Sequence, residues 1–317
     1  MTTHLERTQE FHAMHVPGMP IVLPNVWDAA SARVVLAAGA RAIATTSAGV
    51  AWSRGQRDGN ELTGDGAIDS LRRIVAAVNV PVSVDIERGY GETASDVAAT
   101  ISSVLEMGVS GVNIEDSLMP MAQQEQRISA ARAAADNAGI PLFINARIDT
   151  HRLGEPGGDD WMAETLSRAA VYANAGASGI FVLGALSAAT VRALVGATTL
   201  PVNVAFGPGT LSIGELARAG ASRVSAGSAI AEAAYSVAHD WASTMFSAPE
   251  SVAPSSPALG WAALARRRSG GRGELARWRQ VCIGGTSDAR AARRRPYCDG
   301  PERPWRTVVP IGTARHG

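Results

Sequence analysis

The sequence predicts an α/β fold, a TIM-type (β/α)8 barrel with parallel strands, and three observations support this class. Short β-branched runs alternate eight times with stretches of helical period in about the first 250 residues. The runs are largely apolar, which is typical of parallel strands buried on both faces. Five glycines stand just ahead of a run, where a left-handed helix C-cap is expected: Gly39, Gly108, Gly139, Gly176 and Gly220. A doubly wound sheet is the alternative, but it rarely needs eight alternations.

The expected strands lie at residues 21–25, 42–46, within 82–91, and at 111–115, 141–147, 179–183, 201–206 and 223–226. The expected helices are a lead-in helix within 1–19, then about 28–39, 66–78, from 93 onward, 125–138, 161–175, a short one after 187, 212–219 and 228–245. A long loop of Gly, Arg and Asn is expected between the second strand and the helix at 66. Asp28 is an expected N-cap, and Thr93 with Asp96 forms an expected capping box. Three side chains are expected to dock the lead-in helix: Leu5, Phe11 and Met14.

Composition narrows the class of protein. All 29 basic residues are arginine, which excludes the lysine Schiff bases of class I aldolases and pyridoxal phosphate enzymes. Both cysteines, Cys282 and Cys298, lie near the C-terminus, so the main body needs no disulfide, as suits a reducing cytosol. No secretory pattern opens the chain, and no run approaches the ~18 apolar residues of a membrane span. We expect a cytoplasmic protein without membrane or nucleic-acid partners.

The last part of the chain differs from the rest in charge and in hydrophobic periodicity. Residues 251–317 hold 13 arginines against four acids, while residues 1–250 hold 16 arginines against 25 acids. No sustained periodicity follows residue 246. We therefore predict a barrel domain over residues 1–246 and an Arg/Pro/Gly-rich, poorly ordered tail over 247–317. A basic nucleic-acid-binding arm is the alternative for this tail.

Two acids end the third predicted strand. Side chains along a strand alternate, so Asp85 and Glu87 at i and i+2 are expected to face the same way, towards the barrel axis. Two adjacent carboxylates repel each other unless a cation lies between them or one is protonated. Mg²⁺ takes one or two carboxylates and keeps several waters. Simple pairing of Glu87 with Arg88 or capping of the next helix is the alternative.

Polar side chains also follow the other predicted strands. They are Asn25, Trp27 and Asp28 after the first strand, Thr46, Ser47, Ala48 and Gly49 after the second, Asn113, Glu115 and Asp116 after the fourth, Asn145, Arg147 and Asp149 after the fifth, and Asn203 after the seventh. The active sites of such barrels lie at the carboxyl ends of the strands. Several acids, one arginine and small hydroxyl and amide groups suit a divalent metal that holds a small, oxygen-rich anion.

Five segments carry a family resemblance in order and approximate spacing. They are residues 45–49 (TTSAG), 55–61 (GQRDGNE), 85–91 (DIERGYG), 111–116 (GVNIED) and 145–149 (NARID). Over about residues 8–246 the chain resembles the isocitrate lyase/phosphoenolpyruvate mutase superfamily.

The resemblance implies a role for each matching residue. Asp85 would bind Mg²⁺ (or Mn²⁺) directly, and Glu87 and Glu115 would hold its waters. Ser47 and the backbone amides of Ala48 and Gly49 would bind the carboxylate of an α-oxo acid. Arg147 would bind a second anionic group, Asp58 would act from a mobile gating loop, and Asn203 would contact a substrate carboxylate. Plainer roles are also open: a turn cap for Ser47, a solvated charge for Asp58, a helix cap for Glu115 and Asp116, and an ion pair between Arg147 and Asp149.

One part of the family pattern is missing. The lyases carry a loop after the fourth strand with a Cys-Gly-His sequence whose cysteine is the acid/base, and the mutases carry a lysine and an asparagine there. Residues 116–125 (DSLMPMAQQE) contain none of these cysteine, lysine, histidine or asparagine residues. The other proton-bearing groups are Ser117, Gln123, Gln124 and Glu125 on this loop, with Tyr90 and His151 nearby.

The sequence thus predicts a Mg²⁺-dependent enzyme that makes or breaks a C–C or P–C bond next to a pyruvate-like enolate of a small α-oxo or 2-hydroxy carboxylate or phosphonate. The alternative is a barrel that binds an oxo acid or a metal without turnover, as a sensor or scaffold. The resemblance also implies a homodimer or homotetramer in which subunits exchange the C-terminal helix of the barrel.

Overall fold

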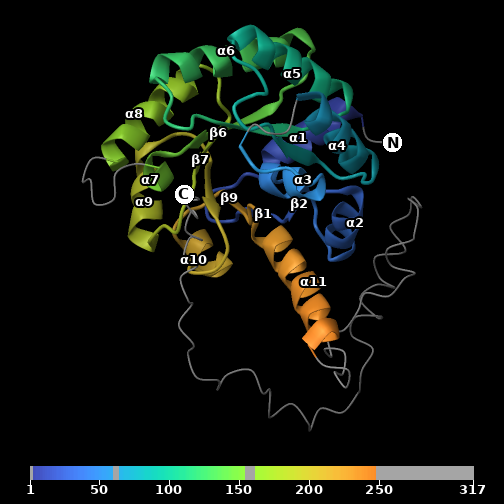
Figure 1. Cartoon of the computed structure of the whole chain (residues 1–317). Coiled ribbons are helices and arrows are strands. Elements are labelled where there is room, and N and C mark those ends of the chain that lie inside the picture. Colours follow the sequence, from blue (N-terminus) through green and yellow to red (C-terminus); the bar gives the residue numbers. More distant parts are fainter. Residues whose placement is uncertain (1–2, 60–63, 154–160, 248–317) are drawn as a thin grey trace, which may run out of the picture. The chain divides into compact units, whose positions relative to one another are not determined.

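The structure, a computed structural model, describes residues 3–59, 64–153 and 161–247. Its strands are β1 (Ile21–Leu23), β2 (Asn25–Val26), β3 (Ile43–Thr45), β4 (Val82–Asp85), β5 (Gly111–Glu115), β6 (Phe143–Ile148), β7 (Gly179–Val182), β8 (Val202–Ala205) and β9 (Arg223–Ser225). All pairs are parallel, in the order β1-β9-β8-β7-β6-β5-β4-β3-β2. β1 pairs with β9 and β2 pairs with β3, so the first predicted strand is split between both ends of the sheet. The sheet therefore forms the predicted TIM-type barrel (Figure 1).

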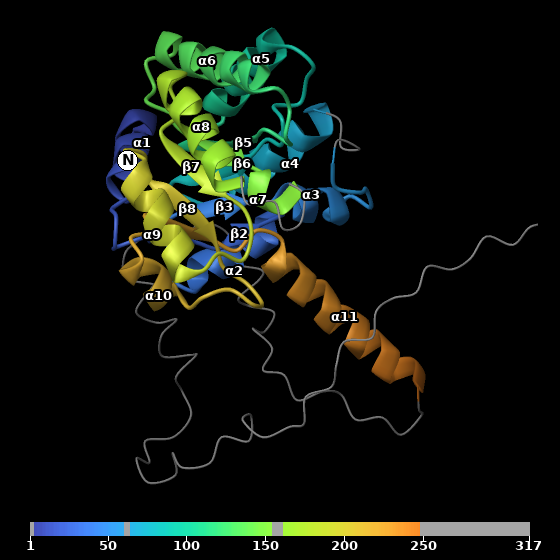
Figure 2. The same cartoon turned by 90° about the vertical axis from the view of Figure 1, so that its left-hand side faces the viewer.

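Helices follow the strands around the ring (Figures 1 and 2). They are α1 (His4–Ala13), α2 (Ala29–Ala37), α3 (Ser47–Ser53), α4 (Gly64–Ala76), α5 (Ala94–Glu106), α6 (Met121–Asn137), α7 (Thr150–Leu153), α8 (Trp161–Asn174), α9 (Ala188–Ala197), α10 (Ile213–Arg218) and α11 (Ala229–Ser247). The short helix α3 lies where a loop was expected, so that part of the prediction is wrong. Its residues 47–51 are all buried, and this packing outweighs the weak helix propensity of Ser and Gly.

The predicted helix caps are confirmed by the structure. The Asp28 carboxylate accepts a hydrogen bond from the Ser31 backbone N–H at 2.6 Å at the start of α2. Thr93 and Asp96 form the capping box of α5. All five glycines expected as C-caps have a positive φ, between 67° and 102°.

An apolar floor fills the amino-terminal end of the barrel. It is a buried cluster of Phe11, Ile21, Leu23, Ala42, Ala44 and Phe143, against which Met14 packs. The docking predictions for Phe11 and Met14 are therefore confirmed, whereas Leu5 is 40% exposed. Six residues separate Leu5 from Phe11, which places Leu5 about 120° away from it around the helix axis.

The last helix, α11, is the least covered element of the described chain. Only Ala231 of its 19 residues is buried, and its far end extends away from the ring in both views (Figures 1 and 2). None of the helices in the described part of the chain is long and apolar enough to cross a membrane. The predicted tail lies outside the described residues, so its order remains a prediction.

Candidate active site

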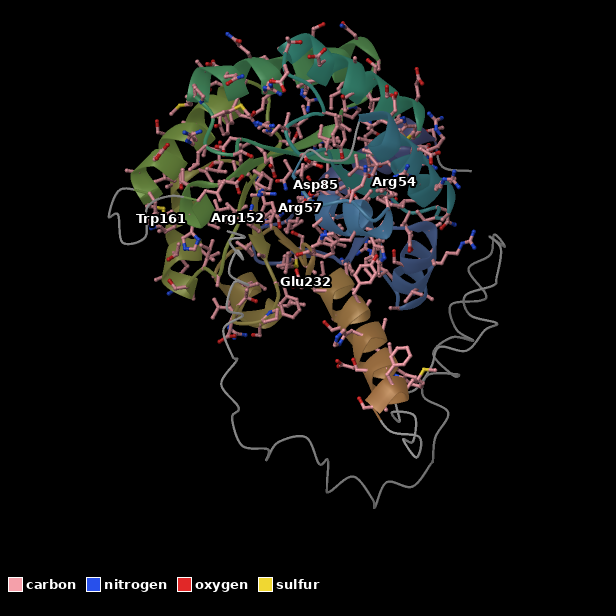
Figure 3. The ribbon with its side chains drawn as sticks, in the orientation of Figure 1. Arg54, Arg57, Asp85, Arg152, Trp161 and Glu232 are labelled. Carbon is pink, nitrogen blue, oxygen red and sulfur yellow. The ribbon has the colours of Figure 1, made fainter. Side chains whose placement is uncertain are left out.

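The end of β4 places Asp85 at the mouth of the barrel (Figure 3). Its backbone N–H donates to the Thr45 hydroxyl of β3 at 2.8 Å, which fixes the strand end. Its carboxylate oxygens accept hydrogen bonds from two backbone N–H groups, that of Ser47 at 3.3 Å and that of Glu87 at 3.2 Å. Both bonds are at or just beyond the long end of the range of about 2.7–3.2 Å for N–H···O hydrogen bonds.

Glu87 lies in a turn that follows the strand. β4 ends at Asp85, and Glu87 has a φ of 50°, followed by Gly89 at 100° and Tyr90 at 54°. The argument from strand alternation therefore does not apply to this pair, because the backbone is left-handed at the second acid. Glu87 is nevertheless only 3% exposed, and its carbonyl accepts the Glu115 N–H at 2.9 Å. Non-glycine residues at positive φ are uncommon and cluster at functional sites.

Arg147 is placed between two acids by the pairing of β5 with β6. Glu115 and Arg147 are register partners, and Arg147 Nη1 lies 2.5 Å from Glu115 Oε2. Arg147 Nε donates to Asp149 Oδ1 at 2.9 Å, so the ion pair expected as the plainer alternative is present. Ser117 Oγ donates to the other Glu115 oxygen at 2.8 Å.

Burial dominates the electrostatics of this group. It raises the pKa of the Asp85 carboxyl, an effect that the nearby Arg147 charge opposes. Burial likewise raises the pKa of Glu115, with Arg147 again opposing and Asp85 adding to the rise. Burial alone would lower the pKa of Arg147, but the charges of Glu115, Asp149 and Asp85 outweigh it and raise that pKa. One buried arginine thus faces three carboxylates.

The β3–α3 turn brings the predicted carboxylate-binding residues to Asp85. Ser47, Ala48 and Gly49 form the buried first turn of α3, and the Ser47 N–H reaches Asp85. A β-carbon on Gly49 would lie 2.8 Å from Cβ of Trp27 and 2.8 Å from Cγ2 of Thr46. Only glycine therefore allows the turn to approach its neighbours so closely.

Two predicted site residues make no contact with this group. Asp58 is exposed and has no hydrogen bond or ion pair within the described residues, which stop after position 59. Asn203 on β8 is 1% exposed and faces the barrel interior, where its Oδ1 accepts from Ser225 at 3.2 Å. The Asn203 Nδ2 atom has no partner in the described parts of the chain.

The structure separates the six candidates for the missing proton donor. Gln124 is buried and directs its amide to the Ile114 carbonyl, and Gln123 and Glu125 are exposed on α6. The His151 ring packs against Trp161, with 4.7 Å between ring centroids. Two candidates remain beside the acids, Ser117 on Glu115 and Tyr90.

The Tyr90 side chain lies beside the end of β4. Its hydroxyl donates to the Asp85 carbonyl at 3.3 Å. Its pKa is raised well above the ordinary value, first by burial and then by the charges of Asp85, Glu87, Asp58 and Glu115. The left-handed backbone of Tyr90 is a feature that the sequence did not show.

The residues fit a hard divalent cation. The Asp85 carboxylate is partly buried, beside a second acid, and its oxygens accept the backbone N–H groups of Ser47 and Glu87. In the described part of the chain, no three His, Cys, Asp or Glu side chains form a complete ligand cluster. One direct carboxylate, with water for the other positions, is the coordination that Mg²⁺ favours.

Fold and site together define a class: a parallel (β/α)8 barrel with an acidic, arginine-containing site at the carboxyl ends of its strands. The family model for phosphoenolpyruvate phosphomutase matches residues 11–246. The chain therefore belongs to this family, within the phosphoenolpyruvate mutase/isocitrate lyase superfamily of enzymes. Members of this superfamily are lyases and mutases that act on oxo acids and generally depend on a divalent metal.

Individual relatives agree with this assignment. An uncharacterized protein of Mycobacterium tuberculosis is 39% identical over 235 residues, 72% of this chain and 86% of that protein. The 2-methylisocitrate lyase of Escherichia coli is 29% identical over 61% of this chain and 67% of the lyase. The crystal structure of a candidate phosphonomutase from Burkholderia cenocepacia is 43% identical, with a TM-score of 0.72 over 74% of this chain and 98% of that chain.

Proposed function

We propose that the protein is a Mg²⁺-dependent lyase or mutase that makes or breaks a C–C or P–C bond next to a pyruvate-like enolate of a small α-oxo or 2-hydroxy carboxylate. The observation that carries this proposal is the partly buried Asp85 carboxylate near Arg147 at the barrel mouth. Burial disfavours the charged form of a carboxylate, so this group is best stabilised by a cation. Mn²⁺ prefers similar oxygen ligands and could replace Mg²⁺.

Three acids would hold the ion. Asp85 would bind it directly, and Glu87 and Glu115 would accept hydrogen bonds from its waters. When bound, the ion would act as a Lewis acid that stabilises negative charge on the substrate oxygens.

The remaining site residues would orient the substrate. Ser47, with the backbone amides of Ala48 and Gly49, would bind the oxo-acid carboxylate at the buried start of α3. Arg147 would bind the second anionic group through its guanidinium, which lies near the end of β6 at the barrel mouth. The roles of Asp58 and Asn203 rest on the family resemblance alone.

The missing cysteine loop limits which reaction is efficient. Cleavage of an isocitrate-like substrate releases an enolate that must be protonated, and losing a positioned general acid typically costs ~10²–10⁴ in rate. Only Tyr90 and Ser117, of the six candidates, lie against the site acids. Enolate formation from oxaloacetate or phosphonopyruvate needs the metal, Ser47 and Arg147, but no thiol. We therefore expect these oxo acids to be turned over faster than methylisocitrate is cleaved.

A substrate panel tests the proposal. Oxaloacetate, phosphonopyruvate and methylisocitrate are assayed with Mg²⁺ and with EDTA, and oxalate is added as a planar mimic of the pyruvate enolate. We expect Mg²⁺-dependent turnover of at least one oxo acid and competitive inhibition by oxalate. Efficient methylisocitrate cleavage without competition by oxalate would show that this interpretation of the site is wrong. Oxalate binding without any turnover would favour the sensor or scaffold alternative.

A further inference from the structure

A fully buried carboxylate lies directly behind the candidate site. Asp116 is the first residue after β5 and is 0% exposed. Its Oδ1 accepts the backbone N–H groups of Leu118 and Asp149, both at 3.2 Å. Its Oδ2 accepts Arg168 Nη1 at 3.1 Å and the Tyr172 hydroxyl at 3.0 Å. A buried charge is tolerated only when it is paired and hydrogen-bonded in this way.

The two side chains on Oδ2 come from α8, on the outer layer of the barrel. Arg168 is 6% exposed and Tyr172 is 0% exposed. The Arg168 Nη1 atom also donates to the Tyr172 hydroxyl at 3.1 Å and to the Met119 carbonyl at 3.0 Å. Helix α8 therefore holds the β5–α6 turn at two places, Asp116 and Met119.

The turn between these two anchors has an uncommon backbone. Ser117 and Leu118 have φ values of 43° and 59°, in the left-handed region that non-glycine residues rarely adopt. Such a conformation persists only where the surroundings over-determine it. It also directs the Ser117 hydroxyl to Glu115 Oε1, so the anchored turn supports a site acid.

Asp116 also holds the neighbouring strand end. Asp116 accepts a hydrogen bond from the backbone N–H of Asp149. The carboxylate of Asp149 in turn accepts a hydrogen bond from Arg147 Nε at 2.9 Å. A continuous chain of contacts thus runs from Arg168 and Tyr172 through Asp116 and Asp149 to Arg147. The guanidinium at the mouth is positioned by a network whose other end is in α8.

We propose that Arg168 and Tyr172 are positioning residues that, through Asp116, fix Arg147 and Ser117 for binding of the anionic substrate. This inference rests on the proposed function, because it assigns Arg147 to the substrate. The metal-binding carboxylate Asp85 is anchored separately, by Thr45, Ser47 and Glu87. Anion binding should therefore depend on α8 much more than metal binding does.

Tyr172→Phe is the mildest test, because it removes one hydroxyl from Asp116 and keeps the ring. Loss of this hydrogen bond loosens the hold of α8 on Asp116, so we expect oxalate affinity in the presence of Mg²⁺ to fall ~10-fold, which is about 1.4 kcal/mol. The KM for the oxo acid should rise by a similar factor, while Mg²⁺ affinity stays within about twofold. Arg168→Met should have a larger effect, and Arg168→Lys should restore part of it.

Glu164→Gln is the matched control. Glu164 pairs with Arg168 at 2.8 Å on the exposed side of α8 and does not reach Asp116. This variant should bind oxalate and Mg²⁺ as the wild type does. Equal loss of Mg²⁺ and oxalate affinity in Tyr172→Phe, or unchanged oxalate affinity, would overturn the positioning role.

A readout that needs no ligand separates the two proposals. In protein labelled with ¹⁵N-arginine, the Nε–Hε signal that disappears in Arg147→Lys reports the contact of Arg147 with Asp149. We expect this signal to shift or broaden in Tyr172→Phe and to stay in place in Glu164→Gln. If the wild type binds no oxalate, the proposed function fails, and this signal alone decides whether α8 positions Arg147. An unchanged signal in Tyr172→Phe contradicts the inference.

Discussion

Arg147 Nη1 and Glu115 Oε2 are 2.5 Å apart at the mouth of the barrel. The two side chains come from register partners on β5 and β6, and each is at least four-fifths buried. The residue assigned to the anionic substrate therefore also neutralises a residue assigned to the waters of the metal. Under the proposed function, the substrate and the waters of the metal would therefore share one electrostatic balance, while the direct metal ligand Asp85 is held separately by Thr45 and Ser47.

Replacement of Arg147 by methionine should unbalance this group. Removing one partner of a buried ion pair typically costs 3–5 kcal/mol, because the acid left behind is uncompensated. We expect a lower unfolding free energy in urea and loss of oxalate binding by calorimetry. The double variant Arg147→Met/Glu115→Gln should regain part of the stability but none of the oxalate affinity. Recovery of oxalate binding in the double variant would remove Arg147 from the substrate site.

Asp85→Ala should abolish Mg²⁺ binding and leave the fold intact. This residue ends β4, and its carboxylate makes no side-chain ion pair in the described residues, so few native contacts are lost. Titration calorimetry measures the affinity, and circular dichroism checks the fold. Asp69→Ala, which removes an acid paired with Arg73 on α4, is the control and should bind Mg²⁺ normally. Unchanged Mg²⁺ affinity in Asp85→Ala would contradict the metal assignment.

Periodicity and end signals in the sequence were sufficient for most of the fold. The capping box at Thr93 and the left-handed glycine at Gly108 mark both ends of α5 because each has a local cause. The helix α3 could not be predicted in this way. It is stabilised by burial of residues 47–51 against distant parts of the chain, and local propensity does not report that burial.

The part of the candidate site that lies at the strand ends was predictable from the sequence. The register of β5 and β6 places Glu115 beside Arg147, so their contact follows from the pairing of these parallel strands. The left-handed turn at Glu87 and the contact of Tyr90 with Asp85 depend on backbone geometry beyond the strand, which no spacing rule supplies.

The free energy of unfolding should decrease at acidic pH because of His15. The His15 residue is 7% exposed, and its ring stacks on the Phe143 ring with 3.8 Å between the ring centroids. Its Nδ1 atom is hydrogen-bonded to the Phe11 carbonyl. Burial, aided by the charge of Arg223, lowers the pKa of His15 to about 3. The unfolded chain binds a proton near pH 6.5 and the folded chain does not, so stability is lost as pH falls from about 6.5 towards 3, by up to about 1.4 kcal/mol per pH unit.

Urea unfolding between pH 4 and 8 measures this dependence. His15→Gln should be less stable at pH 8 but should show a shallower loss below pH 6.5 than the wild type. His12 has a pKa that burial also lowers, and it contributes equally to both proteins. His239→Gln, at an exposed position on α11, should keep the wild-type slope. Equal slopes for His15→Gln and the wild type would refute the assignment.

We propose that a second copy of the chain covers α11. Its exposed apolar side chains include Tyr235 (41%), Val237 (52%), Met245 (75%) and Phe246 (89%). We expect a homodimer or homotetramer by light scattering, and Val237→Asp with Phe246→Asp should shift the mass towards the monomer. Ser236→Asp adds one charge to the same helix at an exposed position and should change the mass little. A monomeric wild type at micromolar concentration would contradict the proposed assembly.

Gly49→Ala should damage the site through packing alone. The added β-carbon would lie 2.8 Å from Cβ of Trp27, 2.8 Å from Cγ2 of Thr46 and 3.3 Å from Cβ of Ala231. Overpacking of this kind typically costs 1–3 kcal/mol, and relief requires α3 to move relative to Trp27 and Ala231. Such a shift would disturb the contact of the Ser47 N–H with Asp85, so oxalate affinity should fall together with the melting temperature.

Gly196→Ala is the matched control for this substitution. Gly196 lies in α9, and a β-carbon there would meet no atom within 4 Å. Alanine is favoured over glycine in a helix by roughly 0.5–1 kcal/mol, so this variant should melt slightly higher and bind oxalate normally. If Gly49→Ala melts and binds oxalate like Gly196→Ala, then α3 tolerates a β-carbon. In that case the close approach of the β3–α3 turn is not what places Ser47 against Asp85.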